Sequence, residues 1–430
     1  MPHENLLRDW HRLCTEIGER RAGTSAERQA ATAIAEGWLA AGLSNVRLET
    51  FPCTCMTVLQ AAVHAPAGPG AWRSVAAVPL VGTPPTPGSK AIEGDLIWLE
   101  MPESAHRLRA RSLRGKILAL FGPLPTDPAT HQRLLQAEPA AVIHIDERLP
   151  FAWVKNDGLY PYWVYRYGAR PTLTVPYLDA WRWRQMGITR LRVQVTARAT
   201  RAESQNVIGE IIGRDPLLAA INLTAHHDTQ CNNVGADDNG SGVVALLALG
   251  RAFAASRRRP LRTVRFISFG TEEQLSVGSA AYVQKHQPTP RDTALVVNFD
   301  SIASPLGHFI MWVAGATALS QFATTRLRAR GVDVVPRHEV SPFFDHFPFN
   351  RAGIPSLTFM RENFPGGRWQ HHSAHDQLEH VSPSELQRLL DATAPLITTL
   401  ANARTLPFPA GLPSAQKAVA QKLARDLLGF

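Results

Sequence analysis

The 430-residue chain is poor in cysteine for its length. Its four cysteines, Cys14, Cys53, Cys55 and Cys231, are too few for a disulfide framework, and they predict a protein of the reducing cytoplasm. Cys53 and Cys55 are spaced so that both could bind one metal ion, but no second cysteine pair follows them. Ordinary structural cysteines are therefore the preferred interpretation, for Cys231 as well.

Long apolar runs are also missing. The longest candidate, Val243 to Ala255, is interrupted by Gly250 and Arg251, and it is shorter than the roughly 18 residues needed to cross a membrane. The N-terminus has no cationic stretch followed by an apolar run, so we expect no signal peptide. These absences predict a protein without a membrane partner.

Lysine is scarce, because only six of the 45 basic residues are lysine and the other 39 are arginine. Together with 36 acidic residues they give a formal net charge of +9. The arginines are scattered along the chain, and the densest run, Arg257 to Arg259, follows a predicted helix end, where cations are favourable. We therefore expect no nucleic-acid partner.

The hydrophobic pattern divides the chain into a discontinuous α/β domain and an insertion. Residues 1–52 and 204–405 alternate strand-like and helical runs, which predicts a mixed, largely parallel central sheet flanked by helices. Residues 53–203 contain Gly/Pro-rich turns between short β-like runs and are predicted to form an inserted, mostly β domain. Residues 406–430 are predicted to form a linker and a C-terminal helix.

Individual elements follow from the same periodicities. In the α/β domain, the predicted strands are residues 46–51, 207–212, 220–224, 263–269, 294–299 and 356–359, and the predicted helices are residues 26–42, 242–255, 278–286 and 383–400. The insertion has strand-like runs at 96–99, 117–121, 141–145 and 173–175. The C-terminal helix carries Val419, Leu423 and Leu427 on one face. Docking on the body of the protein is the preferred role of this face, and a dimer contact is the alternative, so the oligomeric state stays open.

Five polar clusters follow strand-like runs of the α/β domain. They are residues 225–228, 235–242, 270–273, 298–301 and 369–376. Ligands bind at the carboxyl ends of the strands in such sheets, so we expect these clusters to converge. Carboxylates gathered this closely repel one another unless a cation holds them, and zinc accepts both imidazole nitrogen and carboxylate oxygen. The clusters supply enough ligands for two metal ions, including a bridging carboxylate, and the adjacent pair Glu272 and Glu273 offers one ligand and one base.

In this order, the motifs resemble those of the co-catalytic zinc exopeptidases, which include bacterial leucyl aminopeptidases, aminopeptidase Y, glutamate carboxypeptidase II and the glutaminyl cyclases. The resemblance covers residues 1–52 and 204–405. Its landmarks are Ser204-Gln-Asn-Val-Ile-Gly-Glu-Ile, Ala225-His-His-Asp, Gly235-Ala-Asp-Asp-Asn-Gly-Ser-Gly, Glu272-Glu-Gln-Leu-Ser-Val-Gly-Ser, Asn298-Phe-Asp, Asp345-His-Phe-Pro-Phe-Asn-Arg-Ala-Gly-Ile-Pro and His372-Ser-Ala-His-Asp.

The resemblance implies a role for each matching residue and two bound Zn²⁺ ions. One ion is expected at His226 and Asp300 and the other at Glu273 and His372, with Asp238 bridging them. Two further carboxylates have catalytic roles: Glu272 is implied as the general base, and Asp228 is implied to orient His226. The peptide bond between Asp238 and Asn239 is implied to be cis.

Five positions depart from the family pattern or add groups near it. His227 and His371 stand where relatives often carry Tyr, and His371 competes with His372 for the ligand role. The others are His375, an additional imidazole, Ser301, which follows Asp300 where relatives often carry Met or Leu, and Cys231, which lies between two ligands.

The insertion resembles a protease-associated domain. The residues that carry this resemblance are Leu113-Arg-Gly-Lys-Ile-Leu-Ala-Leu, Ala140-Ala-Val-Ile-His-Ile-Asp and Pro171-Thr-Leu-Thr-Val-Pro. The segment Phe151 to Tyr167 contains four of the six tyrosines of the chain. Packing in the core and an aromatic loop facing substrate are equally good interpretations of that segment.

The implied function is hydrolysis of a terminal amide bond in a peptide or an aminoacyl amide, with aminopeptidase activity favoured. A carboxypeptidase or dipeptidase is the alternative, for which Arg351, Arg361 and Arg368 are candidate partners of a substrate carboxylate. A glutaminyl-cyclase-like acyltransferase keeps the same ligands and stays open. A Gly-x-Ser-x-Gly nucleophile motif does not occur, and His338-Glu339 does not begin a His-Glu-x-x-His motif because residue 342 is Pro.

Overall fold

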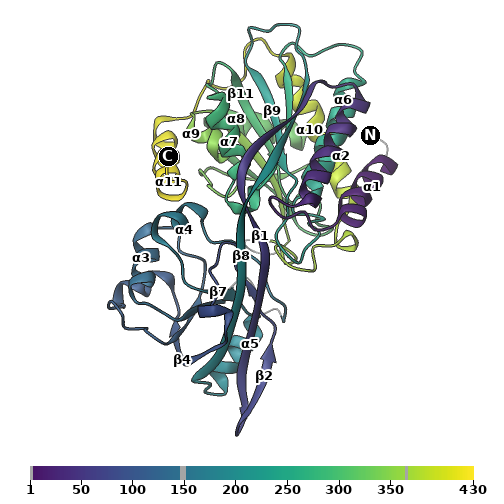
Figure 1. Cartoon of the computed structure of the whole chain (residues 1–430). Coiled ribbons are helices and arrows are strands. Elements are labelled where there is room, and N and C mark those ends of the chain that lie inside the picture. Colours follow the sequence, from purple (N-terminus) through teal and green to yellow (C-terminus); the bar gives the residue numbers. More distant parts are fainter. Residues whose placement is uncertain (1–2, 146–151, 364–366) are drawn as a thin grey trace. The chain divides into compact units, whose positions relative to one another are not determined.

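The computed structural model describes residues 3–145, 152–363 and 367–430 (Figure 1). The chain divides into two compact units, Met1–Cys53 with Ala202–Ala424 and Thr54–Arg201 with Arg425–Phe430. These divisions fall close to the predicted limits of the insertion, while the last six residues group with the second unit rather than forming a separate segment. The divisions after Cys53 and after Arg201 lie within two long strands, β1 (Ser44–Gly68) and β8 (Arg190–Ile211).

The sheet of the first unit has the strand order β13-β12-β14-β11-β9-β10-β8. Neighbouring pairs from β10 through β9 and β11 to β14 are parallel, as is the pair β12 and β13, whereas β8 and β12 run antiparallel to their neighbours β10 and β14. The mixed, largely parallel sheet is therefore confirmed. The strands other than β8 are β9 (Ala220–His226), β10 (Val264–Phe269), β11 (Thr293–Phe299), β12 (His308–Ala314), β13 (Val334–Arg337) and β14 (Ser356–Glu362).

Helices cover both faces of this sheet because successive strand residues point to opposite sides. On one face, Phe266 and Val297 pack with apolar residues of several helices; on the other, Ile267 and Val296 pack with residues of two. The first group contains α1 (His3–His11), α2 (Ser25–Ala41), α6 (Gly240–Ala254), α8 (Thr317–Arg328) and α10 (Pro383–Asn402), and the second contains α7 (Val277–His286) and α9 (Phe347–Arg351) (Figure 1).

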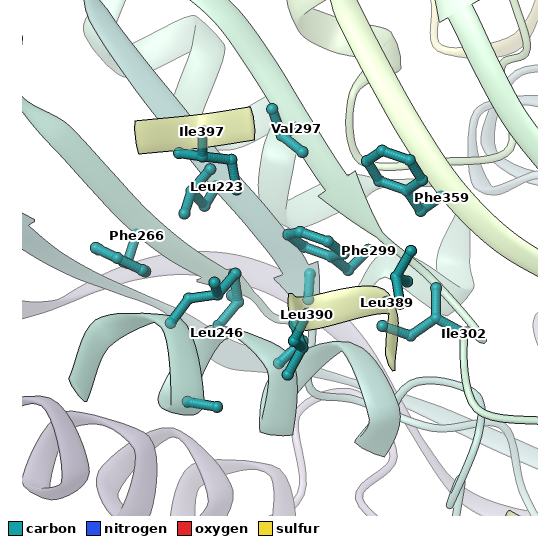
Figure 2. Packing of buried hydrophobic residues seen from close by; sticks show 14 of the residues in the cluster. Leu223, Leu246, Phe266, Val297, Phe299, Ile302, Phe359, Leu389, Leu390 and Ile397 are labelled. Carbon is teal, nitrogen blue, oxygen red and sulfur yellow. The ribbon is translucent and has the colours of Figure 1, made fainter. Parts of the chain in front are cut away.

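The core on the face covered by α1, α2, α6, α8 and α10 contains leucine and phenylalanine side chains from strands and helices that are distant in sequence (Figure 2). Leu223 of β9, Phe266 of β10 and Phe299 of β11 are fully buried there. Leu246 of α6 and Leu390 of α10 pack against the same cluster. Burying side chains of this size contributes roughly 1.5–3 kcal/mol each, so this core holds the strands and helices of the unit together.

The predicted strands and helices of the first unit are confirmed, and five helices and strands were not predicted. The unpredicted elements are α1, α8, α9, β12 and β13. Helix α8 has polar residues between its buried Leu319, Ala323 and Leu327, so its apolar stripe is only three residues long. Short single-turn elements complete the unit: the π-helix Arg12–Ile17 and the 3-10 helices Glu272–Gln274 and Leu378–His380.

The second unit has a sheet with the order β8-β4-β5-β6-β7-β3. The pairs β4 with β5, β5 with β6 and β6 with β7 are parallel, and β2 forms an antiparallel pair with β1. The bounds of its strands are β2 (Ala71–Val75), β3 (Val78–Pro79), β4 (Ile92–Leu99), β5 (Ile117–Phe121), β6 (Ala141–Ile145) and β7 (Thr172–Thr174).

Helices in the second unit were not predicted. They are α3 (Pro128–Gln136), α4 (Pro161–Tyr167) and α5 (Tyr177–Gln185), with short 3-10 helices at Pro87–Ser89 and Pro102–Arg107. The four predicted strand-like runs lie in or directly beside strands β4 to β7. The unit is therefore less purely β than its Gly/Pro-rich composition suggested.

The aromatic segment of the second unit serves packing at one position and is exposed at another. Trp163 in α4 is 2% exposed and its ring meets the Tyr160 ring edge-on at 4.7 Å, which favours the core interpretation there. Tyr165 in the same helix is 89% exposed. Phe151, the first residue of the segment, and Asp146 of the domain motif lie outside the described residues.

The C-terminal helix α11 (Ser414–Leu427) buries Ala420, Ala424 and Leu427. Gln416 accepts a hydrogen bond at 2.8 Å from the backbone N–H of Gly315. Val419 is 47% exposed, so its predicted place on the apolar face with Leu427 is wrong. Its neighbour Ala420 occupies the buried position instead. In the described part of the chain, no helix is both long and apolar enough to cross a membrane.

Candidate metal centre

The candidate site lies in the first unit, where parallel strands end. Strand β9 ends at His226, β10 leads into the 3-10 helix that carries Glu272 and Glu273, and β11 is followed directly by Asp300. The segment after β14 carries the neighbouring histidines 371 and 372. Because parallel strands present their carboxyl ends at one edge of the sheet, these side chains converge as predicted.

The first cluster consists of His226, Asp238 and Asp300. Nε2 of His226 lies 3.3 Å from Oδ1 of Asp238 and 3.8 Å from Oδ2 of Asp300. All three residues are buried, and their potential ligand atoms lie close enough together to hold one metal ion. Imidazole nitrogen and carboxylate oxygen are donors that zinc accepts.

The second cluster uses the other oxygen of Asp238. Nε2 of His371 lies 3.0 Å and Nε2 of His372 lies 3.6 Å from Oδ2 of Asp238, and these three residues form a second possible metal group. Nε2 of His372 is also 3.0 Å from Oε2 of Glu273. Asp238 therefore directs one oxygen to each cluster, as a bridging carboxylate must.

The histidines that depart from the family pattern, His227, His371 and His375, differ in their distance from the two clusters. The rings of His371 and His372 stack with centroids 3.6 Å apart. Nε2 of His372 lies 3.0 Å from Oε2 of Glu273, which favours His372 as the partner of that carboxylate. His227 is fully buried with Nδ1 3.0 Å from Oγ of Ser268, and burial lowers its pKa to about 3. Among the described residues, neither metal group includes His227 or His375.

Asp228 ties the first cluster to the glutamate pair. Its Oδ1 lies 3.5 Å from Nδ1 of His226, the ring nitrogen that does not face Asp238. The same carboxylate accepts hydrogen bonds from the backbone N–H groups of Glu272 at 2.9 Å and Glu273 at 3.1 Å. One fully buried side chain thus orients an imidazole and fixes the backbone that carries both glutamates.

The backbone around the site adopts conformations that ordinary residues seldom take. Non-glycine residues with positive φ cost free energy and tend to occur where a site requires them. Those beside the site are Thr271 (φ 56°), Leu275 (φ 65°), Ser276 (φ 56°), Ser301 (φ 52°) and His372 (φ 55°). The predicted cis peptide bond between Asp238 and Asn239 is confirmed.

Asn239 also begins helix α6. Its Oδ1 accepts a hydrogen bond from Gly242 N–H at 2.9 Å, which is an N-cap, and its Nδ2 donates to the carbonyl of Phe299 at 2.9 Å. A Cβ at Gly242 would lie 2.5 Å from that carbonyl oxygen, so the close approach of α6 to β11 requires glycine here. This contact sets Asp238 beside Asp300.

Three buried residues support the site in roles that were not predicted. Asp376 accepts hydrogen bonds from the backbone N–H groups of Asp237 at 2.7 Å and Asp238 at 2.9 Å. Glu27 of α2 accepts from Thr271 N–H at 3.0 Å, and Arg20 donates to backbone carbonyls of the loop that follows His226. Asp376 lies in the predicted polar cluster 369–376, although no role was predicted for it. Glu27 had a local signal, because Thr24 and Glu27 form the spacing of a capping box, and Arg20 had none.

Burial and neighbouring charges shift the ionisation of the cluster. Burial raises the pKa of Glu272 well above its usual range, and Asp345, Glu273 and Asp300 add to this effect while His226 opposes it. Burial likewise raises the pKa of Glu273 and of Asp300. Buried carboxylates in this number are stable in ionised form only when cations accompany them, and the donor set suits zinc.

Comparison with known proteins relates this part of the chain to a peptidase family. Residues 206–397 match the model of peptidase family M28. The resemblance predicted from the sequence is confirmed over this segment. It contains every residue of the two clusters, together with Asp228, Glu272 and Glu273.

Curated relatives of the chain include bacterial enzymes and vacuolar membrane proteases of yeasts. The chain is 27% identical over 230 residues to leupeptin-inactivating enzyme 1 of Streptomyces exfoliatus, covering 49% of this chain and 52% of that protein. It is 29% identical over 206 residues to aminopeptidase YwaD of Bacillus subtilis, covering 45% and 44%. The chain thus spans about half the length of these relatives or less.

Solved structures of similar fold cover nearly the whole chain. A zinc aminopeptidase from Bacillus subtilis superimposes with a TM-score of 0.73 at 21% identity, covering 95% of this chain and 98% of that one. An M28 peptidase precursor from Shewanella amazonensis gives 0.80 at 18% identity, covering 96% of each. At these identities the likeness shows the fold, and it confirms the predicted α/β class.

The three arginines predicted as carboxylate partners differ in position. Arg368 is buried, and its Nη2 lies 3.2 Å from Oδ2 of Asp238. Arg361 donates from Nε to the carbonyl of Ser304 at 2.7 Å and pairs with Glu385 at 3.2 Å, and Arg351 ends helix α9. The ion pairs therefore connect Arg368, and not Arg361, to a cluster residue.

Proposed function

We propose that the chain is a metal-dependent exopeptidase that hydrolyses the amide bond next to a free amino terminus. The observation that carries this proposal is the position of Asp238, whose two carboxylate oxygens face different clusters. Each cluster contains an imidazole and a second carboxylate. The M28 match and the aminopeptidase names of relatives support the reaction class. The substrate class is a peptide or an aminoacyl amide.

Two zinc ions are the proposed cofactors. His226 and Asp300 would hold one ion, Glu273 and His372 the other, and Asp238 both. When bound, such ions polarise a substrate carbonyl and lower the pKa of a water molecule. The residues fit this role because the two clusters contain the nitrogen and oxygen donors that zinc takes, inside a buried site.

Glu272 is the proposed general base. Its Oε2 lies 3.8 Å from Nε2 of His226, at the edge of the first cluster, and its Oε1 accepts a hydrogen bond from Oγ of Ser276 at 3.2 Å. Its backbone is fixed through Asp228. Placed there, Glu272 can take a proton from the attacking water and later return it to the leaving amine.

A panel of substrates tests the direction of cleavage. We expect hydrolysis of aminoacyl-4-nitroanilides and of free dipeptides, and a loss of at least about 100-fold in kcat/KM when the α-amine is acetylated, since each lost charged contact costs several kcal/mol in a buried site. Equal or faster cleavage of N-acetylated dipeptides would contradict the aminopeptidase assignment.

The position of Arg368 makes a carboxypeptidase or dipeptidase the second candidate, because a buried guanidinium at the cluster could bind a substrate carboxylate. N-acetylated dipeptides with a free or an amidated C-terminus separate this candidate from the first. An N-terminal glutaminyl peptide in the same panel reports cyclisation. The protease-associated identity of the second unit and the cytoplasmic location stay predictions.

A further inference from the structure

Arg368 places a buried positive charge on one oxygen of the bridging residue. Its Nη2 lies 3.2 Å from Oδ2 of Asp238, and the two side chains are 8% and 5% exposed. Its Nη1 is directed at the sulfur of Met360, on the neighbouring strand β14. The guanidinium is therefore held between the sheet and the candidate metal centre, away from bulk water.

The contact between Arg368 and Asp238 makes the charge around the two clusters unequal. Oδ1 of Asp238 faces His226, near Asp300 and Glu272, whose oxygens lie 3.8 Å from the same imidazole nitrogen. Oδ2 faces Arg368 and the two adjacent histidines, with Glu273 as the second carboxylate. The first cluster thus has more negative charge around it, and the second has a permanent cation beside its shared oxygen.

A fixed guanidinium at this oxygen opposes metal binding in two ways. It repels a divalent cation, and the repulsion is strong because screening by water is weak in a buried site. It also occupies acceptor capacity of Oδ2, which the second ion needs. Arginine retains its proton under all ordinary conditions, so the effect does not vary with pH.

We propose that Arg368 makes the cluster of Asp238, Glu273 and His372 the weaker of two metal sites, so that the two sites fill in sequence. The site at His226 and Asp300 fills first and stays filled, and the second ion exchanges. The inference rests on the ligand assignment of the proposed function. It adds that the enzyme has a half-loaded state at low zinc concentration, set by one positioning residue.

Stepwise metal binding by the metal-free full chain tests this proposal without a substrate. In a calorimetric titration with Zn²⁺, we expect two resolved binding events in the wild type. In Arg368→Met the second event should tighten by about 10–100-fold and the first should change little, in line with the usual effect of outer-sphere residues on metal affinity. Arg368→Lys keeps the charge and should retain two separated events.

The direction of the change separates electrostatics from damage to the structure, because a distorted site would bind the second ion more weakly. Arg361→Met is the matched control, since Arg361 is a buried arginine that pairs with Glu385 rather than with Asp238. Arg368→Gln provides a second neutral variant if the methionine variant does not fold. Two equal affinities in the wild type, or an unchanged or weaker second event in the neutral variants, would overturn the proposal.

The outcome is independent of whether the chain cleaves peptides. Tightening of the second event in a protein that hydrolyses none of the test substrates would support the role of Arg368 and refute the proposed function. Hydrolysis with unchanged metal affinities would refute the role of Arg368 alone.

Discussion

Glu272→Gln is expected to lower kcat by about 10²–10⁴-fold, because an amide cannot take a proton from water at neutral pH. The substitution keeps the shape of the side chain, so the hydrogen bond from Oγ of Ser276 and the backbone bond to Asp228 can persist. Metal content and the free energy of unfolding should therefore remain close to those of the wild type. Steady-state hydrolysis and metal analysis of the same preparation check both parts.

Glu273→Gln is the matched control for this experiment. Oε2 of Glu273 lies 3.0 Å from Nε2 of His372, inside the second cluster, so the neighbouring substitution should lose metal as well as activity. The adjacent glutamates would then differ in the way that the proposed division between base and ligand requires. Turnover near the wild-type rate in Glu272→Gln would show that another group takes the proton.

Arg20→Met is expected to destabilise the first unit by about 3–5 kcal/mol, the usual range for removing one partner of a buried charged network. Arg20 is fully buried and donates to five backbone carbonyls. Methionine fills similar space and leaves those carbonyls without a charged donor, which is costly in a buried region. The acceptors are the carbonyls of Leu13, Gly18, His227, Val234 and Gly235.

Urea unfolding of the metal-free protein measures this loss without a contribution from bound metal. Arg12→Met is the matched control, because Arg12 is exposed and pairs only at the surface with Glu36 at 2.7 Å in a contact expected to be worth about 1 kcal/mol or less. A loss for Arg20→Met no larger than that of Arg12→Met would contradict the assigned role.

The part of the fold that could be predicted consists of segments whose apolar residues form a pattern typical of a strand or a helix. Strands β9, β10 and β11 are continuous apolar runs followed by polar residues, and such runs are typical of buried parallel strands. The residues of the two clusters were found because histidines and carboxylates at strand ends have a chemical explanation in common. The pattern also resembled a family, which supplied the role of each residue.

Other features could not be predicted because they depend on contacts between distant segments. Nothing in the sequence distinguishes Arg20 from the other 38 arginines, and Arg368 was predicted only as a candidate partner of a substrate carboxylate. Only the fold shows that both are buried and that Arg368 contacts Asp238. Asp376 lies in a motif of the sequence, but its role could not be predicted, since it accepts two backbone N–H groups more than 130 residues away. The prediction that Val419 lies on the covered face of the C-terminal helix was wrong for a related reason. Helical periodicity does not show which of two adjacent residues is covered by the rest of the protein.

The choice between His371 and His372 illustrates where sequence stops and geometry begins. The two histidines are adjacent, so the sequence alone does not show which of them is the ligand. Both approach Oδ2 of Asp238. The 3.0 Å contact of His372 with Glu273 favours His372 as the ligand, and His372 has a positive φ of 55°. Neither observation follows from the order of residues.

Return of zinc to the metal-free protein is the most direct test that a paired metal site performs the chemistry. Metal is removed with a chelator, Zn²⁺ is added back in measured equivalents, and hydrolysis of an aminoacyl-4-nitroanilide is followed at each step. The metal-free protein is expected to be inactive, and activity should rise until two equivalents are bound. Hydrolysis by the metal-free protein at the rate of the untreated enzyme would contradict the account.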